Sequence, residues 1–155
     1  MTLHRCLCYL ATFPSLGLFY SLDRRDIPFV VSGQRSDSDH CNDTTSTRSV
    51  SGYHVGCCEP IGTDAVTDWA VRRQGATGRN TAECETVALS DATFLSAIPL
   101  ACVLEQVLRR SVRVVMEEDN EASLGAVRRG YSRKLADTRK TQPGSVAGLH
   151  PFDYG

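Results

Sequence analysis

The sequence predicts a single α/β domain built on a mixed sheet, and two observations lead to this class. Three segments before residue 74 read as strands separated by polar turns, whereas the apolar spacing after residue 80 is helical. A short β-branched run at 112–116 follows those helices. Strands joined by turns pair antiparallel, and a strand reached through a helix pairs in parallel. The order β, β, β, α, β, α therefore predicts a mixed sheet with helices packed on it.

The first half of the chain is expected to supply the antiparallel strands. The predicted elements are a helix at 3–11, a strand-like segment at 16–22 and strands at 27–36, 49–55 and 65–73. Pro14 ends the helix, because proline disfavours a helical conformation in the residue before it. The polar segments between the strands are rich in turn-forming residues, which favours short connections. Trp69 is expected to pack in the core or on a sheet face.

The second half is expected to supply the helices and a parallel strand. Asn80 is a good N-cap for a helix, with Glu83 at the third position as in a capping box. Its apolar face is predicted to contain Val87, Ala88, Phe94 and Leu95. Pro99 suits the first turn of a continuing or second helix, which is predicted to run to residue 109. A buried strand at 112–116 and a helix at 120–128, stopped by Gly130, complete the predicted elements, and no element is predicted from residue 131 onward.

The charge and cysteine content narrow the functional classes. The net charge is −1, so no global basic field indicates nucleic acid, but residues 109–140 hold nine Lys or Arg against five Asp or Glu. Such a local basic surface can contact phosphates. The basic candidates are Arg128, Arg129, Arg133 and Lys134, and the alternative is that each is a solvated surface charge.

The seven cysteines show no repeated spacing, which favours reduced thiols in an intracellular protein. A zinc site is a minor alternative, and its candidate ligands are His40, Cys41, His54, Cys57 and Cys58. The apolar N-terminus also resembles a signal peptide, so a small secreted cysteine-containing protein is a further alternative. Pro14 interrupts this apolar run, which is too short to span a membrane, and no membrane partner is expected.

Three acidic residues form the principal candidate site. Asp37 follows the first predicted strand, Glu85 lies in the first turn of a helix, and Asp119 ends the predicted parallel strand. Acids at such positions can converge, and clustered carboxylates bind Mg²⁺. The alternatives are that Asp37 is a turn residue and that Glu83 takes the place of Glu85.

The two acids that precede Asp119 are predicted to be solvated. Glu117 shares strand parity with Asp119, so it is also a possible local substitute for that residue. Glu118 has no such role in the sequence interpretation.

Four segments in order resemble the end of a copia-type retrotransposon polyprotein, at the junction of reverse transcriptase and ribonuclease H. They are "RCLCYLATFPSLGLFYS", "SDSDHCNDTTSTRSVSGY", "DWAVRRQGATGRNTAECETVALS" and "VVMEEDNEASLGAVRRGYS". The resemblance implies a ribonuclease H-like fold in which Asp37, Glu85 and Asp119 are catalytic carboxylates. These would hold two Mg²⁺ ions and cleave the RNA strand of RNA/DNA hybrids inside the cell.

The resemblance also implies a domain organisation. Residues 1–26 would be a remnant of the reverse transcriptase connection, and 27–155 a ribonuclease H-like domain lacking its last strand and helix. That helix carries a fourth carboxylate in the family, so this copy is expected to be degenerate. The alternative is a non-catalytic nucleic-acid-binding remnant. Without the reverse transcriptase part as partner, an exposed apolar patch is expected at Leu7, Leu10, Leu16, Leu18 and Phe19.

Overall fold

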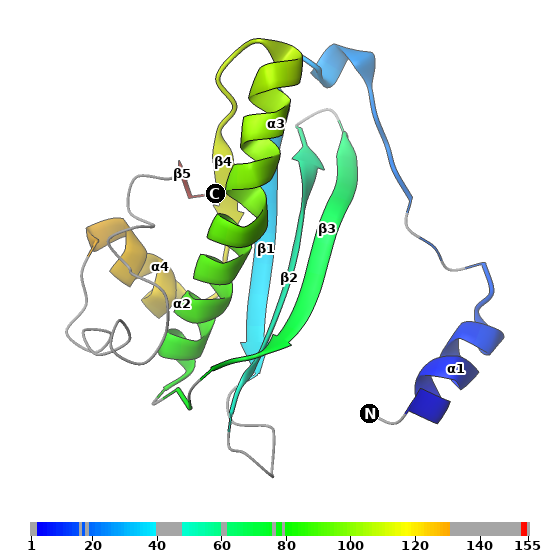
Figure 1. The fold of residues 1–155 in the computed structure, drawn as a ribbon, viewed down its shortest axis with the longest axis vertical. Helices are drawn as coiled ribbons and strands as arrows, with labels where there is room; N and C mark the ends of the chain where they lie inside the picture. The colour runs from blue at the N-terminus through cyan, green and yellow to red at the C-terminus, as the bar shows by residue number, and fades with distance from the viewer. Residues whose placement is uncertain are drawn as a thin grey trace.

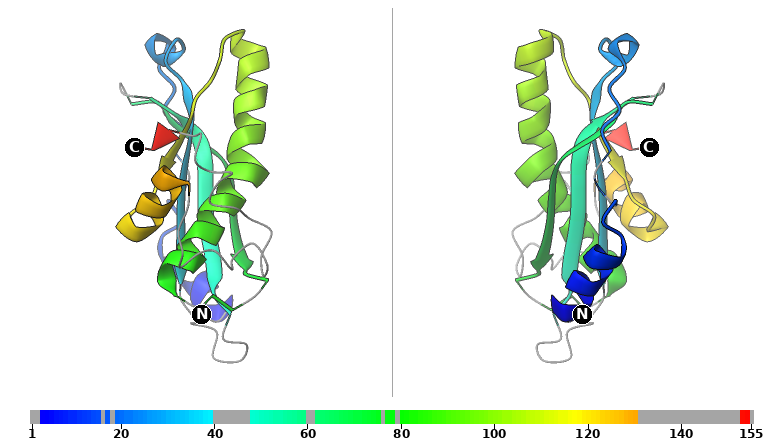
Figure 2. Two further views of the ribbon diagram at one scale, coloured as in Figure 1. Left: turned by 90° about the vertical axis from the view of Figure 1, so that its left-hand side faces the viewer. Right: turned by 90° about the vertical axis from the view of Figure 1, so that its right-hand side faces the viewer.

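The fold is a mixed sheet with a long helix lying across one face (Figures 1 and 2). The computed structural model describes residues 3–15, 17, 19–39, 48–59, 62–75, 77–78, 80–130 and 153–154. The strands are β1 (Val31–Asp39), β2 (Val50–Cys58), β3 (Asp64–Arg73), β4 (Val114–Glu117) and β5 (Asp153–Tyr154). The helices are α1 (Leu3–Thr12), η1 (Arg24–Asp26), α2 (Thr81–Ala92), η2 (Thr93–Ala97), α3 (Ile98–Leu108) and α4 (Glu121–Arg129).

The sheet has the strand order β3-β2-β1-β4-β5. β1, β2 and β3 pair antiparallel in sequence, with Asp37 opposite Gly52, and β4 pairs with β1 in parallel. This confirms the predicted α/β class and its mixed sheet of three antiparallel strands and one parallel strand. β4 reaches its position beside β1 through the helical crossover α2–η2–α3, as the order of elements requires.

The expectation that the chain lacks a fifth strand is wrong, because two residues form the short strand β5. β5 pairs in parallel with β4, with Asp153 opposite Val115 and Tyr154 opposite Met116. The physical reason is that the outer edge of β4 exposes backbone N–H and C=O groups that a further extended segment can satisfy. The expected absence of a last helix falls on residues outside those the structure describes.

Two segments before β1 differ from the predicted strands. The polar residues 24–26 form the short helix η1, and residues 27–30 form a turn, so β1 begins only at Val31. The Asp26 side chain, which is fully buried, explains this turn by accepting hydrogen bonds from the Thr63 backbone N–H and hydroxyl. Of residues 19–22, only Ser21 pairs with the sheet, in a single bridge to Asp64.

The crossover is one continuous helix interrupted by a π turn. Asn80 caps it, accepting a hydrogen bond from the Glu83 N–H at 2.9 Å, as predicted. Pro99 lies in the first turn of α3 and has no N–H to donate to the preceding turn, which accounts for the π turn η2 just before it. The extra residue rotates the following side chains, so Phe94 and Leu95 are exposed rather than on the predicted buried face.

The core lies between this helix and one face of the sheet. Its residues are Tyr53, Val55, Leu89, Ala92, Ala97, Ala101, Val112, Val114, Met116 and Val127. Two buried polar side chains of β1 tie the sheet to the helix backbone. Ser32 donates to the Ala97 carbonyl, and Gln34 donates to the Thr93 hydroxyl at 2.8 Å. These bonds identify Ser32, Gln34 and the even-numbered positions of β1 as the helix-covered face of that strand.

α1 lies away from the sheet on an extended connection (Figure 1). Leu7, Leu10 and Phe19 are 56%, 59% and 84% exposed, as predicted for these three residues. Leu16 and Leu18 lie outside the described residues. In the described part of the chain, only the helix Thr81–Leu108 has the length and apolar composition to cross a membrane, but half of its apolar stretch is buried, as in the core helix of a soluble protein.

Candidate carboxylate site

Glu85 is the centre of the candidate site. It lies in the second turn of α2 and is 4% exposed. Its Oε2 atom is buried without a hydrogen-bond partner among the described residues. Burial, with the charges of Asp37 and Asp119, raises the pKa of Glu85 to about 7, although the nearby Ser38 hydroxyl and N–H favour the charged form. The two other predicted acids, Asp37 and Asp119, therefore lie within electrostatic reach of Glu85.

Glu118 is a fourth acid at this place, and the expectation that it is solvated is wrong. It accepts hydrogen bonds from the Asn120 N–H at 3.1 Å and from the Ser36 hydroxyl at 3.4 Å. Burial, with the charges of Glu85 and Asp119, raises its pKa to about 7. One sequence signal could have found it, because Glu118 has the same strand parity as the buried Met116 and so continues the helix-covered face.

Asp37 and Asp119 approach the site from more open positions. Asp37 lies inside β1 rather than after it, and its side chain is exposed. Strand alternation places it on the sheet face opposite Ser38, which borders Glu85. Asp119 is exposed beyond the end of β4, directly before the N-cap Asn120 of α4. A hollow of about 350 Å³ is lined by Asp119, Glu118 and Ser36, and also by the Arg35–Glu117 pair.

The donor chemistry of the site fits Mg²⁺, but the described geometry does not assemble a complete ligand set. Carboxylate oxygens are the ligands that Mg²⁺ prefers, and the buried, unpartnered Glu85 Oε2 would be satisfied by a cation. However, no three His, Cys, Asp or Glu side chains within the described ranges are grouped closely enough to hold a metal ion.

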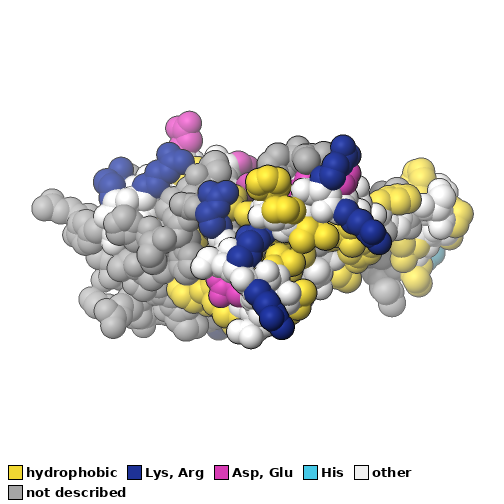
Figure 3. Space-filling model, turned by 90° about the horizontal axis from the view of Figure 1, so that it is seen from above, with side chains coloured by type: hydrophobic (Ala, Val, Ile, Leu, Met, Phe, Trp, Pro, Cys, Tyr) yellow, Lys and Arg dark blue, Asp and Glu magenta, His cyan; other side chains and the backbone are white. Residues whose placement is uncertain are grey.

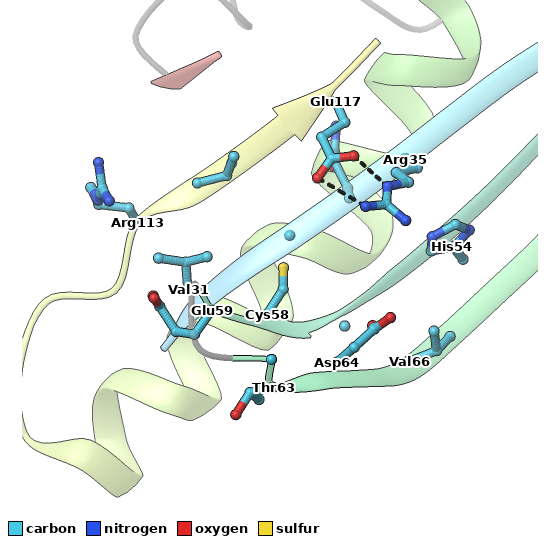
Figure 4. A pocket seen from close by; sticks show the side chains of 15 residues that line it. Val31, Arg35, His54, Cys58, Glu59, Thr63, Asp64, Val66, Arg113 and Glu117 are labelled. Carbon is cyan, nitrogen blue, oxygen red and sulfur yellow. Dashed lines mark hydrogen bonds and ion pairs between the residues drawn. The ribbon is translucent and has the colours of Figure 1, made fainter. Parts of the chain in front are cut away.

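Glu117 is engaged elsewhere and does not substitute for Asp119. It forms a two-point ion pair with Arg35, its neighbour across the parallel β1–β4 pair, and Arg35 Nη2 lies 3.2 Å from Glu117 Oε1 (Figure 4). The next neighbours across the sheet are His54 and then Trp69. These four side chains form a row across the open face, the sheet face opposite α2 and α3. Trp69 is 59% exposed in this row, so it is on a sheet face and not in the core.

The open face also contains a hollow of about 440 Å³ (Figure 4). Its floor includes the paired Gly33 and Gly56, and a Cβ atom at Gly33 would collide with the Cys58 sulfur. Arg35, His54 and Glu117 form one end of the hollow, and Glu59 and Arg113 lie at the other. Burial raises the pKa of the Cys58 thiol, which keeps it protonated and unreactive.

The predicted zinc ligands do not come together within the described part of the chain. His54 and Cys58 line the open-face hollow, whereas strand alternation directs Cys57 to the opposite face of β2. His40 and Cys41 lie outside the described residues. Among the described residues, Cys8, Cys57, Cys58 and Cys102 carry free thiols.

Basic residues lie at two places. Arg128 and Arg129 are exposed in the last turn of α4, as predicted for phosphate contacts, while Arg133 and Lys134 lie outside the described residues. A second group lies at the end of the molecule formed by η1 and the α3–β4 turn, where Arg24 and Arg25 add to arginines of the basic stretch 109–140. Figure 3 shows basic side chains around an apolar area on this end. The described arginines of these segments are Arg24, Arg25, Arg109, Arg110 and Arg113.

The comparisons with known proteins give no family for this chain: no protein-family model matches it, and no curated protein matches it either.

Proposed function

We propose that this chain is a ribonuclease H-like domain of a copia-type retrotransposon polyprotein, descended from an Mg²⁺-dependent endonuclease that cleaves RNA in RNA/DNA hybrids. The observation that carries the proposal is the electrostatic coupling of Glu85 to both Asp37 and Asp119, three acids predicted from separate segments. The sheet order β3-β2-β1-β4-β5 is compatible with this layout. The natural partners would be an RNA/DNA hybrid and the reverse transcriptase part of the polyprotein, inside the cell.

The residues that would hold Mg²⁺ are Glu85, Asp119 and Asp37, with Glu118 as an additional ligand. Bound Mg²⁺ would activate a water molecule and stabilise charge on the attacking and leaving oxygens of the phosphodiester. Ser36 and the Asn120 N–H orient the Glu118 carboxylate, and Ser38 lies beside Glu85. The exposed Arg128 and Arg129 would contact the phosphate backbone.

The proposal includes degeneration of this copy. Asp37 lies on the open face, so a complete ligand set requires its carboxylate to turn around the edge of β1. We therefore expect weak Mg²⁺ binding and hybrid cleavage that is slow at best. Glu118 partly compensates, because it brings a further carboxylate to the side of the site that Glu85 and Asp119 share.

The deciding experiment incubates the purified chain with a labelled RNA/DNA hybrid in Mg²⁺ and in chelator. Glu85→Gln is the control variant, because it keeps the shape of the side chain and removes its charge. Cleavage by the unmodified chain that exceeds the variant supports the enzyme. Equal background in both rejects catalysis by this chain but leaves the proposed ancestry standing.

The second candidate function is non-catalytic nucleic-acid binding, and the arginine-bearing end of the molecule favours it. Arg24 and Arg109 are exposed at this end of the molecule, where Phe29 is also 60% exposed. Cationic side chains beside an exposed aromatic ring suit a phosphate backbone with stacked bases. This function predicts salt-sensitive binding that persists in chelator and in Glu85→Gln. Charge reversal at Arg24 and Arg109 would weaken it.

A further inference from the structure

The outer edge of β3 is open to pairing. β3 is the last strand on its side of the sheet, and within the described residues only Ser21 pairs with this edge, at Asp64. The Gln74 N–H donates to the Ser49 carbonyl at 2.9 Å, so Gln74 and every second residue before it in the regular part of β3 direct their backbone groups toward β2. Because ladder bonds alternate, the backbone groups of Trp69 and Val71 point off the outer edge.

The residues along this edge are unusual for an exposed strand. Trp69 and Val71 are 59% and 77% exposed on the open face, and Asp68 and Arg72 are exposed on the other face. Protected edge strands usually carry prolines or charges of one sign that repel a second strand. This edge instead combines apolar side chains with one acid and one base placed four residues apart.

We propose that β3 pairs antiparallel with β3 of a second copy of this chain, about a two-fold axis at Ala70. This register places Asp68 opposite the partner's Arg72 and Trp69 opposite the partner's Val71, each pair occurring twice by symmetry. It also lets Trp69 and Val71 exchange backbone hydrogen bonds, since both point outward. The proposal is independent of the proposed nuclease function.

Other registers lose this complementarity. An axis at Arg72 or at Asp68 would set like charges opposite one another. An axis at Val71 or at Trp69 keeps the side chains on matching faces but leaves Asp68 without an opposite arginine. The paired stretch is also bounded, because β3 bulges at Thr67, where the register with β2 shifts by one residue. The interface therefore extends over residues 68–72 and is expected to be weak.

α1 lies on the side that a second copy would occupy, so this pairing requires α1 to move. In Figures 1 and 2, α1 projects beyond the β3 edge and stands clear of the sheet. Its exposed Leu7 and Leu10 are therefore on the side of the second copy.

A charge-swap series tests the register. Sedimentation velocity from low to high micromolar concentration is expected to show a reversible monomer–dimer equilibrium for the unmodified chain. Asp68→Arg is expected to weaken dimerisation about tenfold, because two attractive pairs become repulsive. The double variant Asp68→Arg with Arg72→Asp restores both pairs and is expected to recover the dimer. Circular dichroism confirms that each variant is folded.

Trp69 supplies a second readout, because it is the only tryptophan in the chain. Its emission is expected to shift to the blue as the protein concentration rises, since pairing covers the indole. A chain that stays monomeric at all concentrations overturns the proposal. A dimer that Asp68→Arg leaves intact also overturns it, as does a double variant that fails to restore the dimer. A dimer that is disrupted only by Leu7→Asp and Leu10→Asp would place the interface on α1 instead of on β3 and would also overturn the proposal.

Discussion

Glu85 on α2 and Glu118 beyond β4 lie within electrostatic reach of each other, and burial is the largest cause that raises the pKa of each to about 7. Two acids from distant segments thus share a poorly hydrated place beside the sheet. Such a pair costs stability when both members are ionised. The predictions below begin with this relationship.

The stability of the chain without added cations is expected to fall as the pH rises from 5 to 8. The folded state raises the pKa of Glu85 and Glu118 above the ordinary 4.5, so it binds more protons than the unfolded state between pH 4.5 and 7. Their favourable contribution is complete below pH 4.5 and is lost as the pH rises through 7. Urea unfolding across this range measures the trend, and Glu85→Gln with Glu118→Gln should flatten it. A midpoint that rises toward pH 8 in the unmodified chain would contradict the assignment.

Glu118 and Glu117 are expected to differ in their effect on Mg²⁺ binding. At pH 8, Mg²⁺ should raise the unfolding free energy of the unmodified chain by about 1.4 kcal/mol when the Mg²⁺ concentration is about ten times Kd. Glu118→Gln should reduce this gain. Glu117→Gln should preserve it, because Glu117 is paired with Arg35 on the other face. Equal losses in the two variants would show that Glu118 has no special role.

Leu89→Ala and Leu95→Ala test the π turn in the long helix. Leu89 is fully buried, so its truncation should cost about 2–5 kcal/mol of unfolding free energy. Leu95 is 49% exposed because the π turn rotates it outward, and its truncation should cost well below about 1 kcal/mol. Denaturant unfolding of both variants measures the difference. A regular helix that buries Leu95 would make the two costs similar.

Gly33→Ala is expected to destabilise the fold, whereas Gly52→Ala should be close to neutral. A Cβ atom at Gly33 would collide with the Cys58 sulfur. A Cβ atom at Gly52 would have no such neighbouring atom within 4 Å. Overpacking of this kind costs about 1–3 kcal/mol. The Cys58→Ala change should relieve most of the cost in the Gly33→Ala background. Thermal unfolding of the unmodified chain, Gly33→Ala, Gly52→Ala and the double variant Gly33→Ala with Cys58→Ala provides the comparison. A double variant that is as unstable as Gly33→Ala would show that the collision with Cys58 is not the cause.

The sequence predicts the sheet well because its signals are local and strong. The β-branched run around Val114 favours a strand and Asn80 favours the start of a helix, and tertiary packing overrides neither local preference. The position of Phe94 is not predictable in this way, since one inserted residue at the π turn changes which side of the helix it faces. The start of β1 was missed because a buried Asp26 outweighs the strand preference of residues 27–30.

The candidate site was predictable in its members but not in its arrangement. Glu85 and Asp119 lie within electrostatic reach of each other, as the sequence interpretation requires. Asp37 was placed after its strand, but it lies within β1, where alternation assigns it to a face. Glu118 is predicted to be a solvated acid, but it is half-buried and within electrostatic reach of Glu85. Glu118 differs from Glu117 and Asp119 only in having the same strand parity as the buried Met116.

The pairing of β1 with β4 has a consequence for how the chain folds during synthesis. Arg35 and Glu117 meet across 82 residues of sequence, so the centre of the sheet cannot close until the crossover helix has formed and docked. Until then the inner edge of β1, although central in the finished protein, has no neighbour. A ribosome-bound chain that has emerged only as far as α3 therefore exposes the unpaired backbone groups of a strand that is central in the finished sheet, and an incomplete sheet of this kind is prone to pair with other chains.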